Sequence, residues 1–406
     1  MPSSHLNLSS VEKTHIGIGF SRELTTLLAA REAALEAKAQ TRQSSVDVAI
    51  VFCTPHYSPL ETLHVIRQTL NPAKIVGCST AGLIVSSAVE MRGITIIAIS
   101  SQDIKFSAAV MENIAQNDLR PLGAMLAKNI VGSPEQSKRQ SMLLFSDGLI
   151  ANYSPFITGI QEMLGRMFPI VGAGSSDLFH FKETHQYFQD KPLTRSVVAL
   201  LLGGQLTVST ASRHGWKPLG KPRYVDKVDN HVIKTIDGKK ACAIYEDYLS
   251  LDFKNLKKAH ANNELALYPL GIYLEHHKEY LLRDIIDIAE DGSLVCRGDI
   301  PAGAEVHVMI NNKDFCKSSG IEAAWDVKRN LADKQPKLIL IFESLTRHKL
   351  LGRDSSDEIK SIKEIFGPSV PVAGMYSYGE ISLLKSEQSN EGSQLQNGTI
   401  TIFAIA

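Results

Sequence analysis

The chain has 406 residues, of which 44% are hydrophobic and 21% charged, and its 43 basic side chains balance its 43 acidic ones. This length exceeds one ordinary hydrophobic core and predicts two domains. The balanced charge argues against nucleic acid as the main partner, because phosphate binding requires a basic excess. There is no secretion signal, no apolar run long enough to span a bilayer and no Cys-x-x-Cys pair among the five cysteines, so we expect a cytoplasmic protein without membrane contact.

Three segments of the chain follow one pattern. Each begins with a continuous apolar run that predicts a buried strand, at residues 48–53, 142–146 and 338–344. A helix start signal comes next. Ser58 and Ser154 precede prolines and predict N-caps, and Ser355 with Glu358 predicts a capping box. Each helix leads to a second strand with a glycine turn, at residues 77–82, 172–176 and 374–379, and each unit closes with an apolar strand, at 94–99, 197–201 and 400–405.

The repeated pattern predicts an α/β fold of strand–helix–strand units, which form two packed mixed sheets with helices outside. Parallel strands joined by a helix cross right-handed, so we expect the three glycine turns to lie at comparable strand ends. A polar hairpin near residue 238 marks the predicted domain boundary. Residues 1–45 then form an N-terminal strand and helix of the first domain, 46–238 its main part, and 239–406 the second domain.

Polar groups and thiols at the strand ends are candidates for binding or chemistry. Asp147 follows an apolar run, where it serves either an ordinary turn or the wall of a pocket. Cys53 lies three residues from His56, and Cys78 lies in the first glycine turn. A nucleophilic enzyme could use either thiol. No group that would orient a catalytic base is identifiable beside them, so we favour buried structural thiols and expect no enzyme activity.

Several motifs resemble the FIST family of sensory domains. Residues 77–82, Gly-Cys-Ser-Thr-Ala-Gly, are similar to the signature turn of the FIST N domain, and residues 215–220, Gly-Trp-Lys-Pro-Leu-Gly, to its later element. Segments that resemble the FIST C domain lie at residues 269–271, 283–285, 347 and 378–381. Ser344 stands near the position where many members carry a cysteine, so any role of that thiol does not transfer to this chain.

The resemblance implies a small-ligand sensor of signal transduction, with residues 46–238 as the FIST N-like domain and 239–406 as the FIST C-like domain. Some stand-alone bacterial members, of the NosP type, are haem proteins that sense nitric oxide and regulate a histidine kinase or a cyclic-di-GMP enzyme. The resemblance therefore implies haem as a cofactor. His56 and His214 stand closest to the family motifs and are the predicted axial ligands of the iron.

A sensor of an amino acid or another small metabolite, without haem, is the second hypothesis. Arg283, Arg347 and Glu380 would supply the charges for a zwitterion, because arginine holds carboxylates well. A visible absorption spectrum would separate the haem sensor from this one. The predicted ligand-binding residues are Gly77, Cys78, Ser79, Asp147, Gly172, Gly174, Ser175, Arg283, Arg347, Tyr376, Tyr378 and Glu380.

Overall fold

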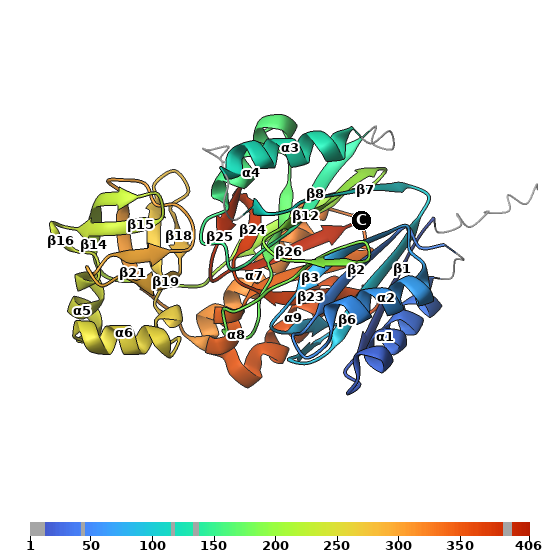
Figure 1. The fold of residues 1–406 in the computed structure, drawn as a ribbon, viewed down its shortest axis with the longest axis horizontal. Helices are drawn as coiled ribbons and strands as arrows, with labels where there is room; N and C mark the ends of the chain where they lie inside the picture. The colour runs from blue at the N-terminus through green and yellow to red at the C-terminus, as the bar shows by residue number, and fades with distance from the viewer. Residues whose placement is uncertain (1–12, 42–44, 115–117, 133–137, 385–391) are drawn as a thin grey trace, which may run out of the picture.

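The computed structural model describes residues 13–41, 45–114, 118–132, 138–384 and 392–406. Three copies of one unit surround a shared core, and a smaller domain is inserted into the third copy (Figure 1). The order in each unit is an edge strand, a helix, a strand, one or two further helices, a strand, a hairpin and a closing strand. No helix in the described ranges is long and apolar enough to cross a membrane.

The elements of the three units correspond one to one along the chain. The first unit contains β1 (Thr14–Ser21), α1 (Thr26–Thr41), β2 (Val48–Cys53), α2 (Pro59–Leu70), β3 (Lys74–Ser79), β4 (Leu83–Val85), β5 (Ala88–Glu90) and β6 (Ile94–Ser101). The second contains β7 (Ile104–Met111), α3 (Leu119–Val131), β8 (Arg139–Ser146), α4 (Ser154–Leu164), β9 (Ile170–Gly174), β10 (Gln186–Phe188), β11 (Lys191–Leu193) and β12 (Val197–Gly204). The third contains β13 (Val208–Arg213), α7 (Lys313–Leu331), β22 (Leu338–Ser344), α8 (Leu345–Leu351), the 3-10 turn η3 (Gly352–Asp354), α9 (Ser355–Phe366), β23 (Val372–Ser377), β24 (Glu380–Leu384), β25 (Gly392–Gln396) and β26 (Ile400–Ile405).

Each unit forms most of its own six-stranded mixed sheet. The strand orders are β1-β6-β2-β3-β10-β11, β7-β12-β8-β9-β24-β25 and β13-β26-β22-β23-β4-β5. The last two strands of every sheet are the hairpin of another unit, so the three units exchange hairpins in a ring. The closing strands β6, β12 and β26 take the same antiparallel place beside β2, β8 and β22, which confirms the predicted repeat.

The mixed α/β class with helices outside is confirmed, but the described residues form four sheets where two were predicted. Each unit completes a sheet of its own because an edge strand precedes it and a borrowed hairpin extends its other side. The inserted domain then builds the fourth sheet. The apolar pattern identifies buried strands but does not say which sheet a strand of three residues joins.

One glycine in each unit lets the two parallel strands approach closely. Gly77, Gly172 and Gly374 each pair with a residue of the preceding strand. A β-carbon at these positions would lie 2.0, 1.9 and 2.1 Å from the carbonyl oxygen of that partner, so no side chain fits. The three glycine turns therefore lie at equivalent strand ends, as predicted.

The inner faces of the three sheets meet in one hydrophobic core. Phe52, Phe145 and Phe342 come from equivalent positions on β2, β8 and β22, and their rings pack edge to face with centroids 5.8, 6.4 and 6.3 Å apart. Each aromatic pair adds about 0.5–1.5 kcal/mol beyond the area it buries. The outer faces are covered by α1 with α2, α3 with α4, and α7 with α9.

The helix starts follow the sequence in part. Ser58 is the N-cap of α2, and its hydroxyl accepts the Glu61 N–H as predicted. Ser154 is instead the first residue of α4 rather than its cap. Ser355 is likewise the first residue of α9, and the Glu358 side chain binds Arg347 instead of closing a capping box. The unpredicted helix α8 separates this start from strand β22.

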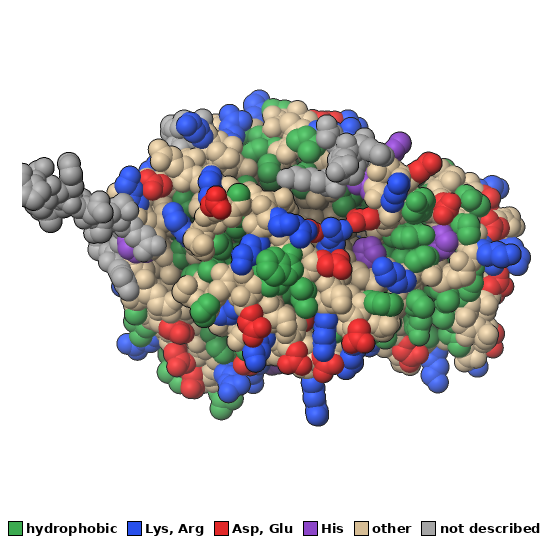
Figure 2. Space-filling model, turned by 180° about the vertical axis from the view of Figure 1, so that it is seen from behind, with side chains coloured by type: hydrophobic (Ala, Val, Ile, Leu, Met, Phe, Trp, Pro, Cys, Tyr) green, Lys and Arg blue, Asp and Glu red, His purple; other side chains and the backbone are tan. Residues whose placement is uncertain are grey.

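The inserted domain lies between β13 and α7, at one end of the molecule (Figure 1). It has an antiparallel sheet, two helices and a hydrophobic core of its own. The predicted boundary at 238/239 falls inside the β15–β16 hairpin, so one sheet continues across it. Charged side chains of both signs are mixed over the face shown in Figure 2. The inserted elements are β14 (Lys217–Asp229), β15 (Val232–Ile236), β16 (Lys239–Lys240), α5 (Ala243–Leu249), α6 (Phe253–Ala261), η2 (Leu265–Leu267), β17 (Leu270–Leu274), β18 (Glu279–Arg283), β19 (Ile285–Ile288), β20 (Leu294–Cys296) and β21 (Glu305–Ile310).

Candidate functional site

A cavity of about 420 Å³ lies between the three-unit core and the inserted domain. We call it the interdomain cavity. Its size is within the range usual for small-molecule sites, and it lies where such sites are common, between domains. The core contributes the ends of β22 and β23, the start of α8 and a loop of the second unit. The lining side chains include Phe179, Phe181, Ser344, Thr346, Ser377 and Tyr378 from the core, and His260, Asp284, Ile285 and Arg297 from the inserted domain.

An aromatic wall closes one side of the interdomain cavity. The Tyr378 ring stacks on Phe181 with centroids 4.8 Å apart, and Phe179 lies 6.1 Å from it. The Tyr378 hydroxyl donates to the Asp177 carboxylate at 2.8 Å and accepts the Phe179 N–H. Leu178, Phe179 and Phe181 all have positive φ, of 63°, 61° and 50°. Left-handed backbone at residues other than glycine costs about 1–2 kcal/mol each, so these hydrogen bonds hold a strained loop in place.

Two charged side chains of the inserted domain line the cavity, and neither forms a close ion pair with any described residue, although each lies within reach of the other's charge. Arg297 is only 4% exposed, yet its guanidinium makes one side-chain hydrogen bond, to the Gly148 carbonyl, and no ion pair among the described residues. It lies over the Tyr378 ring, 5.6 Å from the centroid. The Asp284 Oδ1 atom is out of contact with solvent and has no hydrogen-bond donor. Burial raises the pKa of Asp284 to about 6, and the nearby Arg297 and Arg283 oppose the shift.

These two groups are held side by side by the backbone. The Arg297 N–H donates to the Asp284 carbonyl at 2.9 Å. A buried guanidinium with spare donors binds a carboxylate well, and an unpaired carboxylate binds an ammonium or another donor. The pair therefore offers both charges that a zwitterion requires, beside an aromatic wall.

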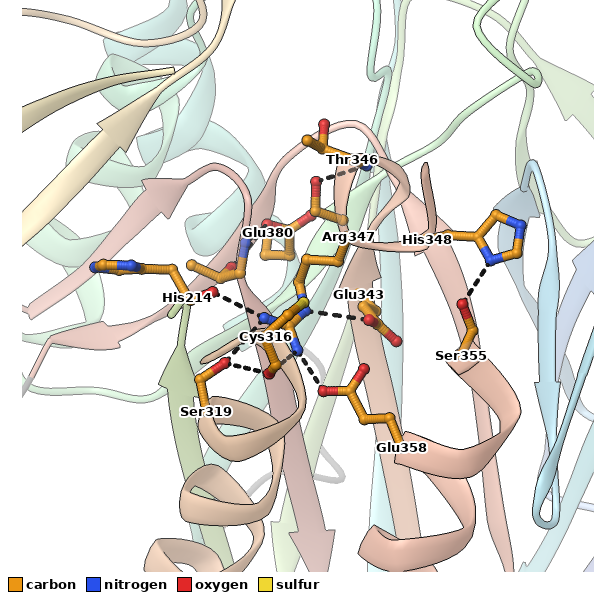
Figure 3. Close-up of polar contacts among 12 residues, drawn as sticks. His214, Cys316, Ser319, Glu343, Thr346, Arg347, His348, Ser355, Glu358 and Glu380 are labelled. Carbon is orange, nitrogen blue, oxygen red and sulfur yellow. Dashed lines mark hydrogen bonds and ion pairs between the residues drawn. The ribbon is translucent and has the colours of Figure 1, made fainter. Parts of the chain in front are cut away.

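A buried ionic cluster lies next to the cavity, one residue beyond Thr346 (Figure 3). Arg347 is fully buried and uses all five of its N–H donors. Nε binds Glu343 at 3.1 Å, Nη1 binds the His214 carbonyl at 2.9 Å and Ser319 at 3.0 Å, and Nη2 binds the Cys316 carbonyl at 3.0 Å and Glu358. Burial raises the pKa of both glutamates. All the donors of Arg347 thus bind partners inside the protein. Its hydrogen bond to the His214 carbonyl holds the chain in place where β13 leads into the inserted domain.

Glu380 is a second buried carboxyl behind the cavity wall. It accepts hydrogen bonds from the Thr399 N–H at 3.1 Å and the Thr399 hydroxyl at 2.7 Å, and it lies 2.6 Å from the Ser377 hydroxyl. Burial raises its pKa to about 8, although these hydrogen bonds act against the shift. The single Ser377 proton can be donated either to Glu380 or to the Glu343 carbonyl at 3.2 Å. Burial, and not these contacts, is what favours the neutral form of Glu380.

Of the predicted ligand-binding residues, Tyr378 lines the interdomain cavity. Tyr376 is fully buried and packs on His348, 4.9 Å between ring centroids. Arg283 lines a different cavity, of about 450 Å³, and donates to the carbonyls of Leu282, Leu395 and Asp299. The structure thus does not bring Arg283, Arg347 and Glu380 into one cavity.

The residues predicted in the first two glycine turns lie inside the core. The Cys78 sulphur lies 3.5 Å from the Met375 sulphur. Ser79 accepts the His185 N–H, and Ser175 binds the Ser146 carbonyl. Asp147 is buried and accepts hydrogen bonds from the Thr184 hydroxyl and the N–H groups of Leu149 and Arg195, which fits a turn-stabilising role. Gly174 donates its N–H to the Gly379 carbonyl, while Gly77 and Gly172 serve the close strand approach described above.

The two predicted iron ligands differ in their contacts. The His214 Nδ1 accepts the Trp216 N–H at 2.9 Å and the ring donates to the backbone of Tyr280, so both nitrogens are in use. Burial lowers its pKa to about 4. His56 is exposed and binds the Thr54 hydroxyl at 3.1 Å. Within the described ranges, no group of three or more His, Cys, Asp or Glu residues is arranged to hold a metal ion.

Three cavity residues, Asp284, Arg297 and Phe181, were absent from the predicted site. Asp284 stands beside Arg283 in one of the resembling motifs, and Arg297 directly follows β20. Their role follows from the pairing of β19 with β20, which brings the two charges together. Phe181 follows a glycine turn by only a few residues, but its stacking on Tyr378 joins segments almost two hundred positions apart.

The comparisons with known proteins identify the class. The FIST N domain matches residues 47–239 and the FIST C domain residues 241–382. Together they cover most of the chain, which belongs to the FIST family of sensory domains that act in signalling and are thought to bind small ligands. The two matches meet at residues 239–241, within the inserted domain.

One relative and two solved structures illustrate what the chain is similar to. The uncharacterized protein MJ1623 of Methanocaldococcus jannaschii is 26% identical over 202 residues, which are 47% of this chain and 38% of that protein. The match thus spans about two fifths of that relative. A cyanuric acid hydrolase has a TM-score of 0.37 at 7% identity, covering 97% of this chain and 100% of the other. A chorismatase has a TM-score of 0.36 at 8% identity, covering 98% and 100%. These scores carry no argument about activity.

Proposed function

We propose that the chain senses an amino acid or a closely similar zwitterion, which binds in the interdomain cavity. The observation that carries the proposal is the unpaired charge of Arg297 and Asp284 beside the aromatic wall. The ligand carboxylate binds Arg297, its ammonium binds Asp284, and its side chain packs on Tyr378 and Phe181. At neutral pH a carboxyl with a pKa of about 6 is mostly ionised, so it can serve as the ammonium partner.

The signal in this proposal arises because the cavity lies between the core and the inserted domain. Arg297 and Asp284 belong to the inserted domain, whereas Tyr378 and Ser377 belong to the core. A ligand that contacts both sides favours the arrangement in which they are close, by its difference in affinity for the open and closed states. A histidine kinase or a cyclic-di-GMP enzyme, which the family resemblance implies as partner, would receive that change.

The test is calorimetric titration of the full chain with the twenty amino acids. The best ligand is then compared with its deaminated acid and its decarboxylated amine. In the wild type the amino acid binds more tightly than either fragment. In Asp284→Asn the amino acid loses its advantage over the acid, and in Arg297→Gln it loses its advantage over the amine. A saturating ligand at a hundredfold excess over Kd also stabilises the fold by about 2.7 kcal/mol.

A matched control is Arg92→Gln, because Arg92 also lies over a tyrosine ring, 5.4 Å from the centroid of Tyr57, but away from the cavity. Its titration is expected to equal that of the wild type. Absence of binding by every amino acid, or equal loss of all three ligands in both cavity variants, contradicts the assignment of the two charges.

Haem-based sensing of nitric oxide remains a separate prediction from the family resemblance. Both ring nitrogens of His214 have partners, whereas His56 binds Thr54 through Nδ1, and no step of the proposal depends on haem. A spectrum recorded after addition of haemin tests it directly.

A further inference from the structure

One buried carboxylate organises the loop that carries the aromatic wall. Asp177 follows the second glycine turn and is only 4% exposed. Its side chain accepts hydrogen bonds from the N–H groups of Phe181 at 2.9 Å, Lys182 at 2.7 Å and Glu183 at 3.2 Å, and from the Tyr378 hydroxyl at 2.8 Å. A single side chain thus ties the loop to the residue that follows β23.

The loop holds a phenylalanine ring at the surface of the interdomain cavity instead of burying it. Phe181 is 45% exposed, whereas Tyr378 beside it is only 4% exposed. The φ of Phe181 is 50°, a left-handed conformation that residues with a side chain rarely adopt. Strain of this kind persists where the surrounding contacts enforce it, and it is concentrated at ligand sites. The Asp177 hydrogen bonds therefore keep one aromatic surface available to a ligand.

The exposed ring of Phe181 is the aromatic surface that a ligand can reach most easily. The Tyr378 ring already contacts the Phe181 ring, at an interplanar angle of 23°, and the Arg297 guanidinium. Other apolar side chains of the lining include Leu149 and Ile285, which are aliphatic. A ligand ring that lies on Phe181 extends the existing stack, and such ring contacts are favourable beyond the area that they bury.

Two cations beside the wall oppose a positively charged ligand side chain. The Arg297 guanidinium lies 5.6 Å from the centroid of Tyr378, and the Lys349 ammonium lies 5.7 Å from that of Phe179. Cations bind to aromatic rings, but here a lysine or arginine ligand would meet like charges. A neutral aromatic side chain gains the ring contact without this repulsion.

We propose that the ligand is an amino acid with an aromatic side chain, which stacks on Phe181, and that Asp177 positions the Phe181–Tyr378 pair to receive it. The inference rests on the proposed function, because Arg297 and Asp284 hold the charged groups of the same ligand. A stacked pair of rings lowers the dissociation constant by about two- to tenfold beyond the effect of buried area. Asp177 acts through the orientation of the two rings and is a positioning residue.

The test is calorimetric titration of the full chain with phenylalanine, leucine and 3-cyclohexylalanine. Cyclohexylalanine has a saturated ring of similar size, so it reports the effect of burial without that of ring stacking. The wild type is expected to bind phenylalanine about two- to tenfold more tightly than cyclohexylalanine, and also more tightly than leucine. In Phe181→Leu the ratio of the phenylalanine and cyclohexylalanine affinities falls to about one, because an aliphatic side chain offers no ring to stack on.

Two variants test the positioning role. Asp177→Asn keeps the size of the side chain but replaces one acceptor oxygen by an amide group. Tyr378→Phe removes one of the four donors to Asp177 and keeps both rings. The same ratio is expected to fall in each variant. A merely structural role of Asp177 would instead weaken all three ligands equally and leave the ratio unchanged.

Phe315→Leu is the matched control, because Phe315 is as exposed as Phe181, at 46%, and lines a different cavity, of about 370 Å³. Its affinity ratio is expected to equal that of the wild type, and thermal melts verify that each variant is folded. Absence of binding by every amino acid overturns the proposed function and this inference with it. Binding of phenylalanine no more tightly than cyclohexylalanine, or a ratio that survives Phe181→Leu, overturns this inference alone. A wild-type ratio in both Asp177→Asn and Tyr378→Phe overturns the positioning role.

Discussion

Glu380→Gln tests whether burial raises the pKa of this carboxyl in the folded chain. The Glu380 side chain is fully buried, and burial raises its pKa to about 8 from an ordinary value of 4.5. The folded chain therefore binds more protons than the unfolded chain between pH 4.5 and about 8. The free energy of unfolding consequently falls as the pH rises through this window. A shift of this size corresponds to about 5 kcal/mol across the window, with a steepest slope of about 1.4 kcal/mol per pH unit.

Glutamine reproduces the neutral form of this group. Its carbonyl can accept both hydrogen bonds from Thr399, and its amide can donate to the Ser377 oxygen, which leaves the Ser377 hydroxyl to donate to the Glu343 carbonyl. At pH 5 the variant and the wild type are therefore expected to agree within about 1 kcal/mol. By pH 9 the variant is expected to be more stable by about 3–5 kcal/mol, because it has no proton to lose.

The assay is urea unfolding of both proteins from pH 5 to pH 9 at constant ionic strength. Glu364→Gln is the control, because it removes an exposed carboxyl from α9 and leaves the buried one in place. The difference between Glu380→Gln and the wild type is the diagnostic quantity, since other groups titrate in both. Two parallel curves of stability against pH refute the reasoning.

Four further changes test other parts of the structure. Gly374→Ala places a β-carbon 2.1 Å from the Ile341 carbonyl oxygen, so we expect the free energy of unfolding to fall by more than about 4 kcal/mol, or no soluble protein. Gly132→Ala is the control and is expected to be nearly neutral in the same denaturation assay. Arg347→Met leaves two buried glutamates uncompensated and is expected to cost about 3–5 kcal/mol at pH 8 and less at pH 5, measured by thermal unfolding. His214→Ala is expected to keep any Soret band that forms in the wild type with haemin, because both ring nitrogens already have partners; loss of the band would restore this histidine as the iron ligand. Cys78→Ala is expected to leave any hydrolase or transferase rate unchanged, because burial raises the pKa of its thiol far above neutrality, and a lost rate would contradict this.

The repeat could be predicted because its signals are local. Apolar runs of strand length, N-cap residues and glycines recur in the same order in all three units. The exchange of hairpins could not be predicted. Strands β4, β5, β10 and β11 have only three residues each, and so short a pattern does not indicate which strand each one pairs with. The sheet count failed for the same reason. A strand pattern fixes which side chains are buried, whereas pairing depends on contacts far apart in the sequence.

The candidate site shows a similar division. Tyr378 could be placed beside a cavity because it lies in a glycine turn at a strand end. Arg347 and Glu380 were equally prominent, but their polar groups already have partners inside the protein, among them Glu358 and Thr399. A sequence shows that a charged residue is present, but it does not show which charges already have partners. Asp284 and Arg297 gain their importance from the opposite circumstance, since folding brings them near each other without a direct ion pair between them.

The arrangement around α8 suggests how occupation of the cavity could reach the rest of the protein. Ser344 and Thr346 line the interdomain cavity at the start of this helix, and α8 also packs on η2 of the inserted domain. The next residue, Arg347, donates to the His214 carbonyl. His214 directly follows β13, at the point where the chain enters the inserted domain. In the proposed function, a ligand held by Arg297 on one side and by the core on the other would therefore pull on both attachments of one short helix. Because all five donors of Arg347 are in use, a movement of α8 would be transmitted to the domain junction rather than absorbed by rotation of that side chain.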